Sequence, residues 1–199
     1  MQDVTIDCLL ALVHLKSFNI AHLDVKPQNI LRSENGVYKL ADFSVTVDLN
    51  KKESSSGEFG TGRYAAPELL NGNFSTKADL YSLGISLSQV SVSADAPLTT
   101  NEWTEMKDDG KLPNRVSAAL TGSFGLAGMV QSMISEYSSR PSAKELHPNN
   151  HRETTLEESK KENMFLRESI KNMHFRHSLS SSCERKLREN KSPLINLSI

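Results

Sequence analysis

The chain has 199 residues, of which 37% are apolar and 24% are charged, and its net charge at pH 7 is −1. This length fits one domain with a sizeable core and a tail, and the near-neutral charge gives no electrostatic reason to expect nucleic acid or an anionic membrane as a partner. Two widely separated cysteines, the lack of a long apolar run and an acidic start predict a soluble intracellular chain, nuclear or cytoplasmic, with reduced thiols.

The first part of the chain is expected to form a helix, a hairpin and a long loop. Apolar residues at helical spacing predict a helix over 3–18, with Asp3 as its N-cap. The dipeptide Asn35-Gly36 lies between two short apolar stretches and gives the strongest β-hairpin signal in the sequence. The polar, Gly/Ser-rich segment that begins at Asp42 predicts a long surface loop.

The following part is expected to be helical. Residues 75–92 are apolar on most sides, which predicts a buried helix capped by Ser75 or Thr76. Helical spacing recurs further along the chain, near 101–108, 122–135 and 141–147. The expected fold is therefore mainly α with a short β-hairpin, and it occupies residues 1–147.

The composition changes after His147. Residues 148–199 form a polar tail rich in Ser, Lys and Arg. Its longest apolar patch at helical spacing is Leu166, Ile170 and Met173, which predicts a short amphipathic helix. The remainder of the tail is too polar to bury a core, so a partly disordered tail is expected after the folded domain.

The stretch HLDVKPQN, residues 22–29, places a carboxylate, an ammonium and an amide close together. Asp24 can accept a proton from a hydroxyl, Lys26 can neutralise developing negative charge, and Asn29 offers an oxygen ligand for Mg²⁺. Asp42, just past the hairpin, supplies a second ligand. The loop is expected to be anchored in the core by the two apolar residues after it, Ile30 and Leu31. These are the parts that phosphoryl transfer requires.

Five blocks, in the order found in eukaryotic protein kinases, carry a resemblance to that family. HLDVKPQN resembles the catalytic loop, and DFS (42–44) stands where the family has its metal-binding Asp-Phe-Gly. GTGRYAAPE (60–68) is similar to the end of the activation segment. KADLYSLGI (77–85) resembles the buried central helix of the C-terminal lobe, and RPSAKEL (140–146) resembles its last helix. The resemblance implies a kinase-like C-lobe of the α+β family over residues 1–147, with ATP and Mg²⁺ as cofactors.

The resemblance also implies a role for each matching residue of the site. Asp24 resembles the catalytic base, and Lys26 resembles the charge stabiliser near the γ-phosphate. Asn29 and Asp42 resemble the two Mg²⁺ ligands. Together with Lys26 and Leu31, they make up the implied nucleotide-binding set.

Further matches concern the activation segment and the support of the catalytic loop. Thr61 resembles the activation-segment residue whose hydroxyl contacts the catalytic base. The structural matches are the buried ion pair of Glu68 with Arg140, the carboxylate of Asp79 that braces the catalytic loop, and the stack of His22 and Phe43.

A narrower resemblance comes from NEWTEMKDDGKLP, 101–113, and from Leu23, where most kinases carry arginine. Both resemble the Wee1/Myt1 group, which implies inhibitory tyrosine phosphorylation of a cyclin-dependent kinase in cell-cycle control. Trp103 within this stretch is expected to be a buried anchor of its helix rather than a substrate contact.

Two departures from the family pattern leave the function open. Ser44 replaces the glycine of Asp-Phe-Gly and is expected to restrict the flip of that turn, because serine enters positive φ less freely. The 199 residues also contain no glycine-rich phosphate loop and no paired strand lysine, so the resemblance covers the C-lobe only, with the N-lobe missing. The chain is then either a fragment or short form of a kinase, or an inactive C-lobe remnant that binds protein partners.

The tail offers three candidate phosphorylation sites. Ser192 precedes Pro193 and matches the minimal preference of proline-directed kinases. Ser178 and Ser180 follow Arg176 and loosely resemble segments that 14-3-3 proteins grip. Chance occurrence in a polar tail is the competing interpretation.

Overall fold

The computed structural model of the chain describes residues 1–51, 60, 62–121 and 125–147. All of them lie in the first of the two units into which the chain divides, Met1–His151. The elements in chain order are α1 (Gln2–Ser17), β1 (Ile20–Ala21), the 3₁₀ helix η1 (Pro27–Asn29), β2 (Ile30–Arg32), β3 (Tyr38–Leu40), β4 (Val47–Asp48), the 3₁₀ helix η2 (Pro67–Asn71), α2 (Thr76–Ser91), α3 (Thr100–Asp108), α4 (Asn114–Leu120), α5 (Leu126–Met133) and α6 (Ala143–Leu146).

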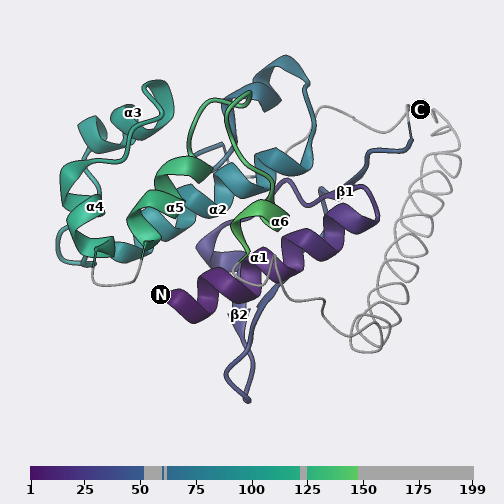
Figure 1. Ribbon diagram of the computed structural model, residues 1–199, viewed down its shortest axis with the longest axis horizontal. Coiled ribbons are helices and arrows are strands. Elements are labelled where there is room, and N and C mark those ends of the chain that lie inside the picture. Colours follow the sequence, from purple (N-terminus) through teal and green to yellow (C-terminus); the bar gives the residue numbers. More distant parts are fainter. Residues whose placement is uncertain (52–59, 61, 122–124, 148–199) are drawn as a thin grey trace, which may run out of the picture. The chain divides into compact units, whose positions relative to one another are not determined.

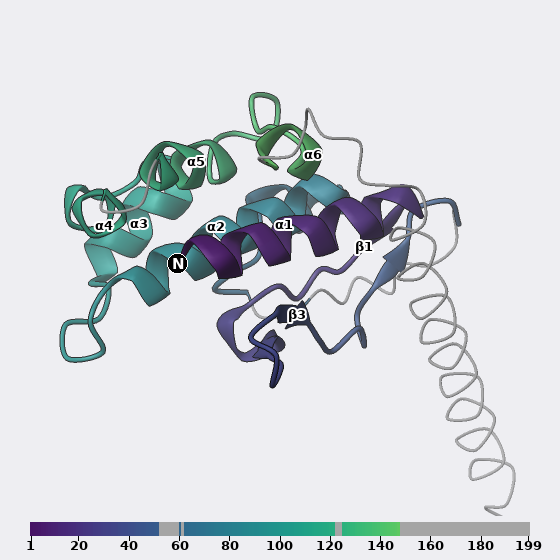
Figure 2. The same cartoon turned by 60° about the horizontal axis from the view of Figure 1, so that its bottom comes forward.

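Helix α2 is the centre of the core, as its apolar sequence predicts. It runs beside α1 and packs against α5 and α4, and α1 in turn contacts α6 and β3 (Figures 1 and 2). Its buried serines remain satisfied because Ser82, Ser86 and Ser88 donate to the carbonyls of Ala78, Ser82 and Gly84 one turn earlier. A helix buried on all sides provides a rigid base for the loops at its ends.

Close packing of α2 against α5 depends on Gly84. A Cβ added there would lie 2.8 Å from the Cβ of Met133 and 2.9 Å from Ile134. The absence of a side chain at this position therefore lets the two helices approach each other.

The predicted hairpin is confirmed. Strands β2 and β3 pair antiparallel with Ile30 opposite Leu40, and Gly36 takes the left-handed φ of 86° in the turn between them. Asp7 of α1 accepts a hydrogen bond from the backbone N–H of Tyr38 at 2.9 Å. The hairpin is thus fastened to α1, below it in the view of Figure 2.

Several expectations about local structure are wrong. Asp3 lies in the first turn of α1, and Met1 occupies the N-cap. The expected N-cap of α2 is confirmed at Ser75, although its hydroxyl makes no capping hydrogen bond. The segment after Asp42 is not an uninterrupted loop, because β4 pairs with β1. The sequence does not predict α4, and of the helix expected over 122–135 the structure shows α5, which ends at Met133, while 122–124 lie outside the described residues.

Two apolar side chains are also more exposed than expected. Leu31 does not anchor the catalytic loop in the core, since 54% of it is exposed. Trp103 is half-buried rather than fully buried. The predicted tail helix and Ser178, Ser180 and Ser192 lie outside the described residues. Within the described ranges, no helix is both long and apolar enough to cross a membrane.

Candidate active site

Asp79 in the first turn of α2 holds the backbone of the loop that begins at His22. Its two carboxylate oxygens accept hydrogen bonds from the N–H groups of His22, at 2.8 Å, and Leu23, at 2.7 Å. Leu23 has a left-handed φ of 63°, a costly conformation for a residue with a side chain, and these bonds stabilise it. Burial raises the pKa of Asp79 to about 7, while both N–H donors act in the opposite direction.

His22 connects this loop to the segment after β3. Its fully buried ring packs on Phe43, with the ring centroids 4.8 Å apart, and its Nε2 lies 3.1 Å from the carbonyl oxygen of Ala41. Its Nδ1 accepts a hydrogen bond from the N–H of Asp24, so the proton sits on Nε2. Burial lowers the pKa of His22, which favours the neutral ring and a structural role.

Asp24 is the carboxylate at the centre of the site. It is only 8% exposed, and its Oδ2 accepts a hydrogen bond from Nδ2 of Asn29 at 2.9 Å and lies 2.6 Å from Nζ of Lys26. The same Nδ2 also donates to the backbone carbonyl of Asp24. The short 3₁₀ helix η1 folds the loop back and so brings Asn29 onto Asp24.

Asn29 and Asp42 lie on neighbouring backbones. The N–H of Ala41 donates to the carbonyl of Asn29 at 2.8 Å, next to the Ile30–Leu40 pair of the hairpin. Because the amide nitrogen of Asn29 is committed to Asp24, its oxygen is the atom left to act as a ligand.

In the Asp-Phe-Ser turn, the unfavourable left-handed backbone conformation occurs at Asp42 and not at Ser44. Asp42 is exposed with a left-handed φ of 59°, whereas Ser44 is not among the described residues with positive φ. The N–H of Ser44 donates to Oδ1 of Asp42 at 3.3 Å. In this conformation, serine replaces glycine without backbone strain.

The oxygen atoms of Asn29 and Asp42 fit Mg²⁺, which prefers hard oxygen ligands and commonly takes one or two carboxylates together with substrate phosphates. Among the residues that the structure describes, no group of three or more His, Cys, Asp or Glu could hold a metal ion alone. A metal at this position would therefore depend on oxygen atoms of a bound phosphate.

The predicted ion pair of Glu68 and Arg140 forms in the interior. Nη1 of Arg140 lies 2.5 Å from Oε1 of Glu68, and the side chains of the two residues are 1% and 9% exposed. The guanidinium also donates to the carbonyls of Lys77 and Ser135 and lies over the ring of Tyr81. The pair thus ties η2, which contains Glu68, to the start of α2 and to the residues that follow α5.

Gly60 is a site residue to which the sequence assigned no role. Its N–H donates to the carbonyl of Leu23 at 3.1 Å, and a Cβ added there would lie 2.0 Å from Oδ1 of Asp24. Only glycine fits this position. The glycine of the GTGRYAAPE block was the available signal, but the contact depends on tertiary structure. Thr61 lies outside the described residues.

An open groove of about 440 Å³ lies beside the loop. The described residues lining it are Lys26, Gln28, Asn29, Arg63 and Tyr64. The groove thus joins the predicted catalytic loop to the predicted activation segment.

The family model and the similar proteins found by comparison are all protein kinases. The Protein kinase domain family matches residues 1–183. The membrane-associated tyrosine- and threonine-specific cdc2-inhibitory kinase wee-1.3 of Caenorhabditis elegans is 32% identical over 150 residues, 73% of this chain and 22% of the relative. Its Drosophila melanogaster counterpart is 35% identical over 149 residues, 73% of this chain and 27% of the relative. The proto-oncogene serine/threonine-protein kinase mos of Rattus norvegicus is 44% identical over 90 residues, 43% of this chain and 26% of the relative. The chain therefore spans about a quarter of the length of these curated relatives.

Proposed function

This chain belongs to the protein kinase family, and we propose that its site transfers the γ-phosphate of ATP to a protein hydroxyl. The observation that carries the proposal is that Asp24 accepts a hydrogen bond from Asn29 and forms an ion pair with Lys26. A carboxylate held by a neighbouring amide and ammonium is oriented toward one incoming hydroxyl, which is what phosphoryl transfer needs from the protein.

Each residue has one task in this proposal. Asp24 accepts the proton of the attacking hydroxyl, and Lys26 beside it stabilises the negative charge of the phosphoryl group in transfer. Asp79 positions the loop through the N–H groups of His22 and Leu23.

Asn29 and Asp42 would hold the Mg²⁺ that protein kinases use with ATP, and this ion would neutralise phosphate charge. Leu31, exposed at the end of the loop, is the proposed apolar contact for the base of the nucleotide. Its exposure is consistent with a side chain that meets a ligand rather than the core.

The proposed substrate is a tyrosine of a cyclin-dependent kinase. Two relatives that match 73% of this chain are named tyrosine- and threonine-specific cdc2-inhibitory kinases, which supports this class. The Wee1/Myt1-like stretch 101–113 forms α3 and the turn after it, next to the groove residues Arg63 and Tyr64.

The proposal is tested by phosphate transfer. Because the 199 residues contain no glycine-rich phosphate loop, the assay joins them to the N-terminal lobe of a protein kinase and supplies Mg·ATP and a cyclin-dependent kinase. We expect phosphotyrosine on the substrate, and we expect Asp42→Ala to abolish it while the exposed Asp95→Ala does not. Transfer that persists unchanged in Asp42→Ala would contradict the proposed metal site, and absence of transfer from the folded fusion would contradict the function.

A further inference from the structure

We propose that the groove beside the catalytic loop binds an acidic side chain of the protein substrate, and that Arg63 is the residue that pairs with it. This inference rests on the proposed function, because it assigns a substrate class to the same site. It concerns binding of the peptide around the acceptor hydroxyl and not the transfer step.

The charge of the groove is the first observation. Of the five described residues that line the groove, Lys26 and Arg63 are positively charged and none is acidic. Lys26 is already paired with Asp24. Within the described ranges no carboxylate pairs with Arg63, which is exposed. Arg63 is therefore the groove cation that can receive a carboxylate from outside.

Arg63 is held in place by an aromatic ring rather than by an anion. Its guanidinium carbon lies 5.2 Å from the ring centroid of Trp103. A cation–π contact restrains the side chain but leaves the N–H groups at its edge able to donate to a carboxylate, often in a bidentate pair. The arrangement is thus preorganised for an anion.

The ring that holds Arg63 also contacts Tyr64, the next residue of the same segment. Trp103 meets Tyr64 edge-on with ring centroids 6.4 Å apart, and the hydroxyl of Tyr64 donates to Gln89 of α2. Nζ of Lys107, one turn after Trp103, donates to the carbonyl of Gly62 at 2.7 Å. Helix α3 is therefore bonded to the backbone directly before Arg63, and Lys107 adds a second positive charge beside that backbone.

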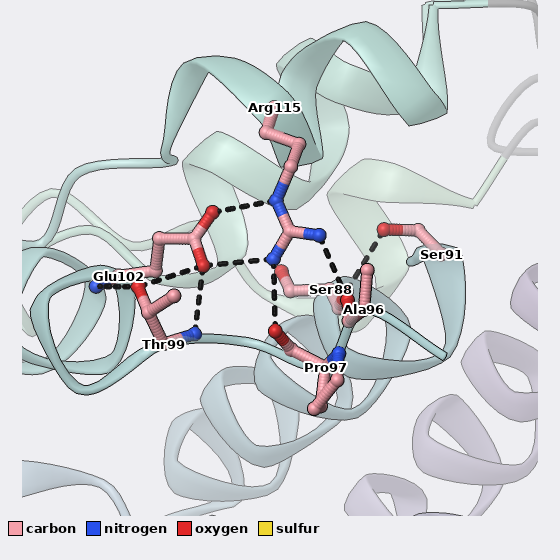
Figure 3. Close-up of polar contacts among 7 residues, drawn as sticks. All are labelled: Ser88, Ser91, Ala96, Pro97, Thr99, Glu102 and Arg115. Carbon is pink, nitrogen blue, oxygen red and sulfur yellow. Dashed lines mark hydrogen bonds and ion pairs between the residues drawn. The ribbon is translucent and has the colours of Figure 1, made fainter. Parts of the chain in front are cut away.

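A polar clasp fixes the start of α3. Figure 3 shows the guanidinium of Arg115 between the carboxylate of Glu102 and the carbonyls of Ala96 and Pro97. Glu102 also accepts hydrogen bonds from Thr99, which completes a capping box at the start of the helix. The hydrogen bonds from Arg115 and Thr99 lower the pKa of Glu102 to about 2. Trp103 follows Glu102 directly, so this clasp fixes the platform for Arg63.

The position of the groove determines what kind of ligand it takes. Lys26 and Asn29, which contact Asp24, line the same groove as Arg63, so a peptide that fills this groove in the proposal has its hydroxyl near Asp24 and a neighbouring residue near Arg63. An extended chain advances about 3.3 Å per residue, so the residue that meets Arg63 lies close to the acceptor in sequence. Charge complementarity favours Glu or Asp at that position.

The test uses the full 199-residue chain and short peptides that contain one tyrosine. One glutamate is placed in turn at each nearby position on either side of the tyrosine, and each peptide has a glutamine counterpart. Trp103 is the single tryptophan of the chain, so its fluorescence reports binding at this groove. Fluorescence anisotropy of dye-labelled peptides gives the affinity independently of any change in Trp103 emission.

We expect one glutamate position to bind about tenfold more tightly than its glutamine counterpart, the effect of one charged hydrogen bond. Arg63→Gln should abolish this preference, and Arg63→Lys should keep part of it. Arg32→Gln is the matched control, because Arg32 is also an exposed arginine near an aromatic ring, that of Tyr38, but lies on the hairpin.

Equal binding of glutamate and glutamine peptides, no measurable binding of any peptide, or a preference that survives Arg63→Gln would each overturn the inference. Phosphate transfer in the fusion protein judges the proposed function separately. Transfer without a glutamate preference would overturn the inference alone, whereas a glutamate preference without transfer would overturn the proposed function alone.

Discussion

Truncation of Arg140 to alanine should be among the most destabilising single substitutions in the described part of the chain. Arg140 is 2% exposed, and its guanidinium serves both oxygens of Glu68 and the carbonyls of Lys77 and Ser135. Arg140→Ala removes all these donors at once and leaves the carboxylate of Glu68 buried without its cation.

The magnitude follows from what remains after the substitution. Removing one partner of a buried ion pair typically costs about 3–5 kcal/mol, because the other charge stays desolvated. Total stabilities of domains are about 5–15 kcal/mol, so this loss is a large fraction. At about 2–4 °C per kcal/mol for a domain of this size, the melting temperature should fall by about 6–20 °C.

The assay is urea or thermal unfolding followed by circular dichroism, with Arg115→Ala as the control. Arg115 also pairs with a glutamate, Glu102, but its side chain is 41% exposed, and exposed pairs contribute about 1 kcal/mol or less. Replacing both Arg140 and Glu68 by leucine should recover much of the loss, since no charge then remains buried. Equal losses in Arg140→Ala and Arg115→Ala would refute the argument from burial.

Three further substitutions test other parts of the structure. Gly84→Ala should lower the free energy of unfolding by about 1–3 kcal/mol, because the added Cβ would lie 2.8 Å from the Cβ of Met133 in α5. Gly128→Ala is the control: no atom lies within 4 Å of its Cβ position, so it should stabilise α5 by about 0.5–1 kcal/mol. The reverse order of the two effects in thermal unfolding would contradict the helix packing. Gly60→Ala should slow phosphate transfer on the order of 10²-fold in the fusion protein by displacing Asp24, and an unchanged rate would show that the contact is absent. Burial lowers the pKa of His22, so the unfolded chain takes up a proton near pH 6.5 that the folded chain does not. The contribution of His22 to stability is thus complete above about pH 6.5 and is lost as the pH falls below it. The difference in unfolding free energy between the unaltered chain and His22→Phe should therefore shrink between pH 8 and pH 5, and a constant difference would contradict it.

Local chemistry explains which elements could be predicted from the sequence. The hairpin follows from Asn35-Gly36, whose turn preference does not depend on the rest of the chain. Helix α2 follows from a sequence that is apolar on most sides of its 16 residues. The grip on Asp24 was predictable as a motif, since Lys26 and Asn29 lie only two and five positions after it.

Features that depend on distant contacts could not be predicted in this way. Strands β1 and β4 have two residues each and pair across more than twenty positions, so neither has a periodic signal. Gly60 carries no sign that Asp24 lies against it. The apolar side chain of Leu31 predicts a place in the core, but in the hairpin this side chain is exposed.

The clasp of Arg115 on Glu102 was also missed. Its members come from separate helices, and at the level of sequence they look like ordinary surface charges. Helix α4, which carries Arg115, has only seven residues and is too short for a clear period.

In the proposed mechanism Asp24, held by Asn29 and Lys26, receives the proton of the substrate hydroxyl. The most direct measurement is the single-turnover rate of phosphate transfer by the fusion protein and its Asp24→Asn variant at saturating Mg·ATP. We predict a rate about 10²–10⁴-fold lower in Asp24→Asn, compared at a temperature where the variant is folded, and no loss in the control Asp95→Asn. An Asp24→Asn protein that transfers phosphate at the unaltered rate would contradict it.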